Sequence, residues 1–217
     1  MSNYLYHDVE QNSDEWFSLR AGRLTSSNIS KVMANEGKAF GEPAKKLAVV
    51  LAVERLTGKP TAEGFSNEHM ERGHEQEPLA RMLYEETHFS VVKNGGFFEC
   101  GDIGCSPDGL VGDTGVIEIK SAIPSIHYAR VKRQSIDPSY RWQCVMNLAK
   151  TERSWLDFIS FCPDFPEGKQ LYVYRLHRSE IEDEVKRMDD RVTQFRKLLG
   201  DSMRLIENSK YELLESA

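Results

Sequence analysis

The sequence lacks the features that mark membrane-spanning, secreted and zinc-ribbon proteins. No apolar run approaches the roughly 20 residues needed to cross a bilayer. Residues 1–11 contain no basic segment followed by an apolar one, as a secretory signal requires. The four cysteines form no C-x-x-C pair, which argues against a zinc ribbon or an iron–sulfur site. A cytoplasmic protein with reduced, mostly buried thiols is therefore expected.

An excess of basic residues is also missing. The net charge is −6, which argues against a protein that coats nucleic acid non-specifically. A nuclease is still compatible with this charge, because a metal site concentrates carboxylates while basic side chains gather elsewhere. The candidates for a basic surface, each of which also suits a solvated face, are Arg20, Arg23, Lys45, Lys46, Arg130, Lys132, Arg133 and Arg141.

The first part of the chain, about residues 13–87, is predicted to be helical. No repeat or linker rich in proline, glycine and serine divides the sequence, so one domain over residues 1–217 is expected. Capping residues and apolar periodicity predict two short helices over 13–34, then helices over 43–56 and 67–87, with a mobile loop over 35–42.

A sheet core is predicted over about residues 89–176, where the apolar pattern changes. Asn94-Gly95-Gly96 predicts a hairpin within 89–99, and residues 112–115 predict a second turn within 103–120. The other elements expected are a helix over 126–150, interrupted near Asp137-Pro138, and strands over 154–161 and 170–176.

The chain ends in a predicted long helix, about residues 178–208. Its apolar residues recur at alternating spacings of four and three, which indicates a stripe that packs either on the domain's own sheet or against another subunit. Helices, a mostly sequential sheet and a final helix indicate a mixed α/β domain. The stripe consists of Ile181, Val185, Met188, Val192, Phe195 and Leu199.

Three charged residues point to metal-dependent chemistry. Asp108 follows a Ser-Pro pair, and Glu118 and Lys120 alternate on the apolar segment 116–120, so both point to one face of a strand. A hairpin turn at 112–115 brings Asp108 near Glu118. Neighbouring carboxylates repel unless a cation joins them, and Mg²⁺ or Mn²⁺ prefers such oxygen ligands. Lys120 beside the metal is suited to phosphodiester hydrolysis.

A third carboxylate is expected on the helix over 67–87. Glu77 shares a helical face with Ala80 and Tyr84, which aims it at the sheet edge. His74 and Glu75 are rivals, and the spacing does not choose among the three. The motifs also have an ordinary interpretation, because Pro-Asp-Gly is a common turn and Glu-x-Lys on a strand is often a surface pair.

Taken together, these motifs resemble the YqaJ/lambda-exonuclease family of phage-type alkaline exonucleases, within the restriction-endonuclease-like (PD-(D/E)xK) superfamily. The resemblance extends from about residue 13 to 150, in the family's order. The blocks that carry it are Trp16-Phe17-Ser18-Leu19-Arg20 with Gly22 and Thr25-Ser26-Ser27; Gly73-x3-Glu77; Ser106-Pro107-Asp108-Gly109-Leu110 with Glu118-Ile119-Lys120; and Tyr140-x2-Gln143-x2-Met146.

The resemblance implies a restriction-endonuclease-like core, a central mixed β-sheet flanked by helices. It assigns Asp108 and Glu118 as direct metal ligands, with the Ile119 carbonyl contributing, and Lys120 as the catalytic lysine. It also selects Glu77 as the residue that holds the second of two Mg²⁺ ions, partly through water. Mn²⁺ is expected to substitute for Mg²⁺.

The resemblance further implies a pocket for the 5′-terminal phosphate. Arg20 would supply a bidentate donor, with Thr25 and Ser27 adding hydroxyl groups. Arg20 also suits a surface ion pair. The remaining DNA-contact candidates are Ser106, Gln143, which also suits an ordinary polar contact, and Arg130. This sequence departs from some members, which carry another phosphate-binding arginine just after the Glu-x-Lys strand; here residues 124–130 offer only His127 or Arg130.

The implied activity is 5′→3′ exonucleolytic degradation of one strand of linear double-stranded DNA to mononucleotides. It would leave a 3′ single strand for recombination in a phage or prophage setting. The family also suggests a homotrimeric ring and a single-strand annealing protein as partner. The alternatives are an endonuclease of the same fold and a non-catalytic clamp on DNA ends. Loop 35–42, with Lys38 and Phe40, is either an element that helps split the duplex or a surface loop.

Overall fold

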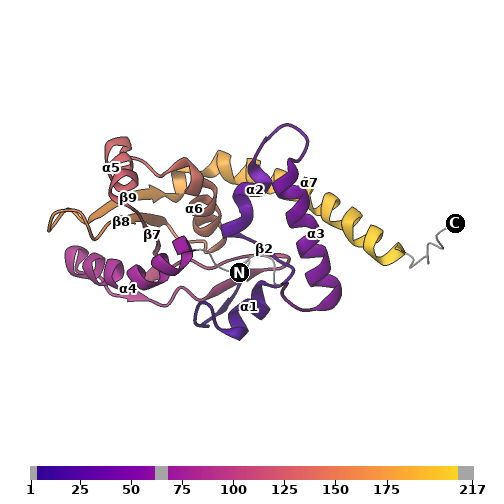
Figure 1. Ribbon diagram of the computed structural model, residues 1–217, viewed down its shortest axis with the longest axis horizontal. Helices are drawn as coiled ribbons and strands as arrows, with labels where there is room; N and C mark the ends of the chain where they lie inside the picture. Colours follow the sequence, from indigo (N-terminus) through magenta and orange to yellow (C-terminus); the bar gives the residue numbers. More distant parts are fainter. Residues whose placement is uncertain (1–3, 62–67, 210–217) are drawn as a thin grey trace.

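The computed structural model describes residues 4–61 and 68–209, with side chains from Glu75 onward in the second range. The protein is a mixed α/β structure in which two sheets are flanked by helices, as expected from the sequence. The strand-rich part lies at one end and a helical layer at the other, and the last helix runs along one side of the molecule (Figure 1). No described helix is both long and apolar enough to cross a membrane.

A five-stranded sheet forms the half of the protein that carries the charged motif. Only one neighbouring pair, β7 with β8, is parallel. Helix α4 (Glu68–His88) covers one face, and α5 (Pro124–Arg133) and α6 (Pro138–Lys150) cover the other (Figure 1). The strand order is β3 (Val92–Lys93), β6 (Gly109–Val111), β7 (Gly115–Ser121), β8 (Trp155–Phe161) and β9 (Leu171–His177).

A second sheet contains four strands. Two of them come from the N-terminal part of the chain, and the other two precede the charged hairpin in the sequence. Helix α1 (Asp14–Arg20) packs beside this sheet, with Trp16 buried against Phe97 and Val9. The strand order is β1 (Leu5–His7), β4 (Phe97–Cys100), β5 (Ile103–Cys105) and β2 (Leu24–Thr25). Strand β2 is parallel to β5, which sets the start of the following helical segment against this sheet.

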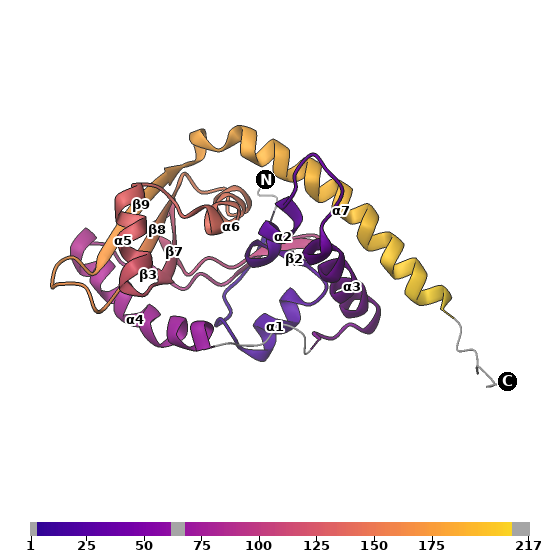
Figure 2. The same cartoon turned by 45° about the horizontal axis from the view of Figure 1, so that its top comes forward.

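The helical layer contains the predicted C-terminal stripe. Helix α7 (Glu182–Asn208) packs mainly on α3 (Glu42–Thr57), and also on α2 (Ile29–Met33) and α6. The stripe therefore packs within the domain, on helices rather than on the sheet. Figure 2 shows α7 running past α6, α2 and α3. Two short 3₁₀ turns, η1 (Ser26–Asn28) and η2 (Arg178–Glu180), precede α2 and α7.

The predicted hairpin over residues 89–99 is wrong. Strand β3 pairs with β6 in one sheet, whereas β4 pairs with β1 and β5 in the other, so the chain crosses between sheets. The two glycines are needed for this crossing. A Cβ on Gly95 would lie 1.7 Å from the Pro107 carbonyl oxygen, and Gly96 has φ +59° beside the His7 carbonyl. Glycine here permits close backbone approach instead of a tight reversal.

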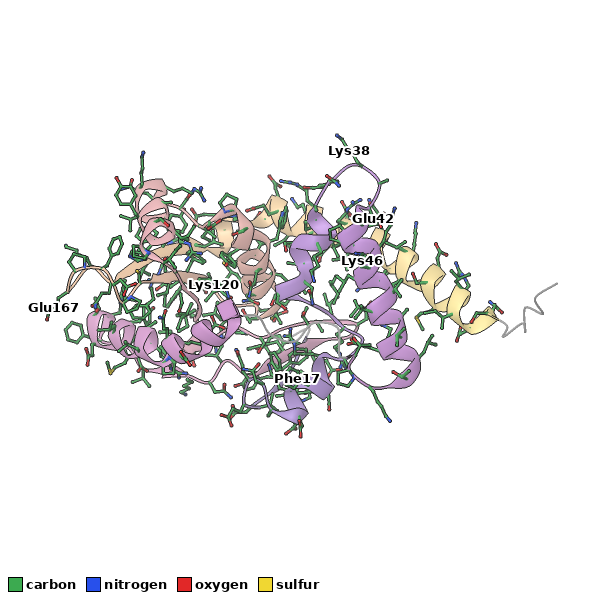
Figure 3. All side chains as sticks on the ribbon, in the orientation of Figure 1. Phe17, Lys38, Glu42, Lys46, Lys120 and Glu167 are labelled. Atoms are coloured by element: carbon green, nitrogen blue, oxygen red, sulfur yellow. The ribbon has the colours of Figure 1, made fainter. Side chains whose placement is uncertain are left out.

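Loop 35–42 is tied to α7, contrary to the expectation of a mobile loop. Phe40 packs edge-on against Phe195 at 5.9 Å, and the Arg191 guanidinium lies over the Phe40 ring. Arg191 also donates to the Lys38 carbonyl at 2.9 Å. The labelled Lys38 marks this loop in Figure 3, far from Lys120. Phe40 is thus part of the domain's packing.

Candidate active site

An 830 Å³ cleft opens where β7, α4, α1 and α6 meet. Lys120, one of the residues that line it, is labelled in Figure 3 between α4 and α6. Most of the residues proposed from the sequence line this cleft, although they come from separate segments of the chain. Those on its wall are Arg20, Ser27, Glu77, Ser106, Asp108, Ile119, Lys120, Arg130 and Gln143, whereas Glu118 and Thr25 are buried next to them.

The hairpin of β6 and β7 positions Asp108 beside the Glu-x-Lys segment. Gly109 pairs with Ile117, as the turn at 112–115 predicts. The Asp108 backbone N–H donates to the Ile117 carbonyl at 3.1 Å, and its carboxylate accepts from the Ile119 N–H at 2.6 Å. Both ends of Asp108 are therefore held by β7, which aligns this carboxylate with the strand that bears Glu118 and Lys120.

Glu118 is fully buried and has a polar partner for each carboxylate oxygen. Lys120 Nζ lies 2.5 Å from Oε1, which also accepts from Gln143 at 2.6 Å. Asn147 donates to Oε2 at 2.6 Å. A buried carboxylate is stable only when paired and hydrogen-bonded, and these contacts supply both conditions. Glu118 is thus held in one orientation by β7 and α6.

Glu77 is placed at the cleft by the packing of α4. Ala80 and Tyr84, on the same helical face, are buried against β7 and its neighbours. The Tyr84 hydroxyl donates to Asp157 at 2.7 Å, and Asp157 also pairs with Arg175 at 2.8 Å. These contacts anchor the helix two turns from Glu77, while the side chain of the rival His74 lies outside the described residues.

Glu77 and Glu118 are hard to ionise, first because they are buried and then because of neighbouring negative charge. Burial, followed by the charge of Asp108, raises the pKa of Glu77 to about 8 and that of Glu118 to about 7. Burial by itself lowers the pKa of Lys120, but the charges of Glu118 and Asp108 outweigh it and leave that pKa raised. Lys120 is therefore a cation at neutral pH, and the site favours additional positive charge.

The donor set suits a divalent cation such as Mg²⁺. Asp108, Glu77 and the neighbouring Ile119 offer hard oxygen atoms in one cleft, with Glu118 directly behind. Among the described residues, no three acidic, histidine or cysteine side chains form a complete ligand cluster. A backbone carbonyl and water would have to complete the coordination, as is usual for Mg²⁺.

A second polar cluster lies at the α1 end of the cleft. The Arg20 guanidinium stacks over Trp16 at 4.0 Å and donates to Ser27 at 2.9 Å and Thr25 at 3.3 Å. Burial lowers the pKa of Arg20 to about 10, so it stays protonated at neutral pH. In the described part of the chain, no hydrogen bond uses Arg20 Nε or Nη1, which leaves donors for an anion.

Ser106 connects this cluster to the carboxylates. Its hydroxyl accepts from the Trp16 indole N–H at 2.8 Å and donates to the Gly96 carbonyl at 2.6 Å. Two residues later the chain reaches Asp108. Ser106 therefore joins the stacked Arg20–Trp16 pair to the segment that presents Asp108, in addition to lining the cleft.

Arg130 and His127 have mainly structural contacts. The Arg130 guanidinium is buried and donates to the Lys120 carbonyl at 3.2 Å and to Ser160 at 3.1 Å. His127 is fully buried, with its ring nitrogens facing Ser160 and the Lys169 carbonyl. These contacts leave neither residue well placed to replace a phosphate-binding arginine, so Arg20 is the principal arginine available to an anion in the described cleft.

The basic surface expected from the sequence is partly neutralised by ion pairs. The candidates bound to a carboxylate are Arg23 with Glu99, Lys45 with Glu42, Arg130 and Arg133 with Asp137, and Arg141 with Glu184.

Two features of the site, Asn147 and the position of Tyr140 beside Lys120, were not expected from the sequence. Asn147 lies four residues after Gln143 on α6, so both amides face Glu118. That helical spacing was a usable signal. The Tyr140 ring lies 5.2 Å from Lys120 Nζ and 5.3 Å from the Arg130 guanidinium carbon. It forms one wall of the cleft next to the amine.

The sequence and the fold are similar to those of known proteins. A family model described as a YqaJ-like viral recombinase domain matches residues 15–154. An alkaline exonuclease from Laribacter hongkongensis, LHK-Exo, is 30% identical, with a TM-score of 0.79 over 90% of this chain and 96% of that one. Its complex with dAMP is similar at 31% identity and a TM-score of 0.80, with the same coverage of both chains.

A more distant structure shows the same fold. A phage-related exonuclease from Haemophilus somnus 129PT has a TM-score of 0.69 at 15% identity, over 86% of this chain and 96% of that one. No curated protein matches the sequence.

Proposed function

Because this chain belongs to the family of YqaJ-like viral recombinase domains, we propose that it is a metal-dependent 5′→3′ exonuclease. It degrades one strand of linear double-stranded DNA to mononucleotides and leaves a 3′ single strand for recombination. The observation that carries the proposal is the joint placement of Glu77, Asp108, Glu118 and Lys120 around one cleft that has Arg20 at one end. A carboxylate–lysine site beside an anion-binding arginine suits a phosphodiester substrate.

Hydrolysis depends on residues that hold the scissile phosphate and stabilise its developing charge. Bound Mg²⁺ would neutralise the phosphate oxygens and lower the pKa of the attacking water. Asp108, Glu77, Glu118 and the Ile119 carbonyl would hold the metal. Lys120 orients the water and donates to the charge that develops in the transition state. Gln143 and Asn147 keep Glu118 in place throughout.

Arg20 is proposed to bind the terminal phosphate while the next phosphate reacts. Its free guanidinium atoms suit the two oxygens of a phosphate, and the Ser27 and Thr25 hydroxyls lie beside it. Arg20→Ala is expected to reduce the preference for 5′-phosphorylated over 5′-hydroxyl ends by about tenfold to a hundredfold, because a charge-assisted bidentate contact is lost. Initial rates on the two duplexes measure the preference.

The matched control for this variant is Arg133→Ala, since Arg133 is exposed on α5 and does not line the cleft. It should keep the preference of the unmodified protein. Unchanged discrimination by the Arg20 variant would place the phosphate pocket elsewhere.

Metal binding is expected to strengthen as pH rises. The pKa values of Glu77 and Glu118 are raised above the usual 4.5. Their contribution to the stability of the metal-free protein is therefore present below about pH 4.5 and is lost as pH rises through about 7 to 8. Because the metal replaces the protons, Mn²⁺ at about 100 times its Kd should raise the unfolding midpoint by about 5–10 °C at pH 9.

The same Mn²⁺ addition should have a much smaller effect at pH 6, where both groups hold protons. Thermal unfolding at the two pH values with and without Mn²⁺ measures this. An equal Mn²⁺ effect at pH 6 and pH 9 would contradict the assignment of these glutamates as ligands. Glu77→Gln should weaken the pH dependence.

The proposed activity is tested with a linear duplex labelled separately at each 5′ and 3′ end. Release of labelled mononucleotide from the 5′ ends first, only with Mg²⁺ and not with a chelator, is the expected result. Covalently closed circular duplex should resist digestion, and cleavage of the circle would favour the endonuclease. No hydrolysis with any divalent metal would favour the DNA-end clamp.

We also propose a homotrimeric ring that acts with a single-strand annealing protein. Both proposals rest on family membership. Analytical ultracentrifugation should give about three times the chain mass of 24.8 kDa, and a monomer at micromolar concentration would contradict the ring.

A further inference from the structure

Two isoleucines at the start of α5 form an apolar shelf in the cleft. Ile123 and Ile126 line it just beyond Lys120, and they are 46% and 43% exposed. Ile123 is the extended residue that precedes α5 and Ile126 lies in the first turn of the helix, and both side chains line the cleft. An exposed apolar pair close to the charged residues of the cleft suits a partner that offers apolar surface next to a phosphate.

The position of the shelf indicates which part of a substrate reaches it. Arg20 comes from α1, and β7, which bears Lys120, lies between α1 and α5 in both Figures 1 and 2. A strand whose terminal phosphate binds Arg20 and whose next phosphate lies at Lys120 continues toward α5. The second nucleotide from the 5′ end therefore meets Ile123 and Ile126.

We propose that this shelf, named here the α5 shelf and formed by Ile123 and Ile126, binds the base of the nucleotide on the 3′ side of the scissile bond. A nucleotide combines a charged phosphate with a largely apolar base face, and the cleft offers Lys120 and the α5 shelf in that sequence. The contact requires no hydrogen bond to a base edge, so it accepts all four bases. This inference rests on the proposed exonuclease function for the direction of the strand.

The shelf has a role distinct from that of the rest of α5. Tyr128 and Val131 are also exposed on this helix, at 60% and 39%, but neither lines the cleft. Arg130, between them, is buried under the site and holds the Lys120 carbonyl. The apolar contribution of this segment to the cleft thus comes from Ile123 and Ile126, while Tyr128 and Val131 offer a surface outside the cleft for a control substitution.

The test compares DNA duplexes that carry an abasic tetrahydrofuran at the first or the second nucleotide from the 5′ end. Binding is measured by fluorescence anisotropy in EDTA at low salt, so that metal-dependent hydrolysis does not interfere. The unmodified protein should bind the duplex with the abasic site at position two about fivefold to twentyfold more weakly than the intact duplex, because the isoleucines lose apolar contact. An abasic site at position one should have less effect.

The variant Ile123→Ser/Ile126→Ser should bind the intact and position-two abasic duplexes equally weakly. Val131→Ser, with similar exposure on the same helix, should discriminate like the unmodified protein. Equal binding of all duplexes by the unmodified protein, or unchanged discrimination in the double variant, would overturn the proposal. A change in oligomeric mass without a change in discrimination would also overturn it, because the shelf would then be a subunit contact.

Failure of this inference and failure of the nuclease proposal are separable. The binding assay contains no active metal, so a protein that hydrolyses nothing still reports whether the α5 shelf senses the base. Conversely, a protein that hydrolyses DNA but binds intact and abasic duplexes equally would contradict the role of the α5 shelf and leave the exonuclease proposal intact.

Discussion

Lys120→Ala is expected to reduce DNA hydrolysis by about 10²–10³-fold while duplex binding remains, since the loss of one preorganised donor to the transition state has an effect of this size. Among the residues that the structure describes, Lys120 is the one whose ammonium group forms an ion pair with the buried Glu118. Its charge is assured at neutral pH because Glu118 and Asp108 raise its pKa against the effect of burial. Single-turnover rates at saturating Mg²⁺ measure the loss, and anisotropy measures binding.

The control for the Lys120 variant is Lys132→Ala. Lys132 is exposed on α5 and lies outside the cleft. It should leave the single-turnover rate unchanged. Because the Lys120 variant leaves Glu118 buried without its cation, a thermal unfolding scan must show that the protein remains folded. A folded Lys120→Ala protein with a near-normal rate would show that another group performs this role.

Glu118→Gln is expected to abolish tight Mn²⁺ binding and to lower hydrolysis by about 10³-fold, because the direct carboxylate ligand and its electrostatic contribution are both removed. The substitution preserves shape. Asn147 Oδ1 is buried without a hydrogen-bond partner among the described residues, so rotation of that amide lets it accept from the new glutamine. The protein should therefore fold, which separates loss of metal binding from loss of structure.

Calorimetric titration with Mn²⁺ measures directly how Glu118→Gln changes metal binding. Asp113→Asn is the matched control, since Asp113 is exposed in the turn of the same hairpin and outside the cleft. An isotherm for Glu118→Gln that matches that of the unmodified protein would remove Glu118 from the ligand set.

Much of the secondary structure was predictable because its signals are local. Gly58 ends α3 in the left-handed conformation, and the turn at 112–115 pairs β6 with β7 as expected. The hairpin predicted at Asn94-Gly95-Gly96 is wrong because glycine is present there for a reason other than a tight turn. Glycine was required there by the Pro107 backbone, which is distant in sequence.

The candidate site was predictable to the extent that its residues occur in motifs. Asp108, Glu118 and Lys120 are brought together by one hairpin, so their proximity follows from strand alternation and a short turn. Asn147 and the shelf isoleucines belong to none of these motifs. The commitment of Arg130 to Ser160 and the Lys120 carbonyl depends on how α5 packs over β8, which neighbouring residues do not specify.

Sequence alone determined the mixed α/β class, the family and the carboxylate–lysine hairpin, because each depends on contacts within about fifteen residues or on motif order. Tertiary structure decided that the strands form two sheets, that α7 packs on α3, and that Arg20 and the α5 shelf line one cleft. These features arise from burial between distant segments. The free energy of such burial depends on the whole packed arrangement and has no signature in any single stretch of chain.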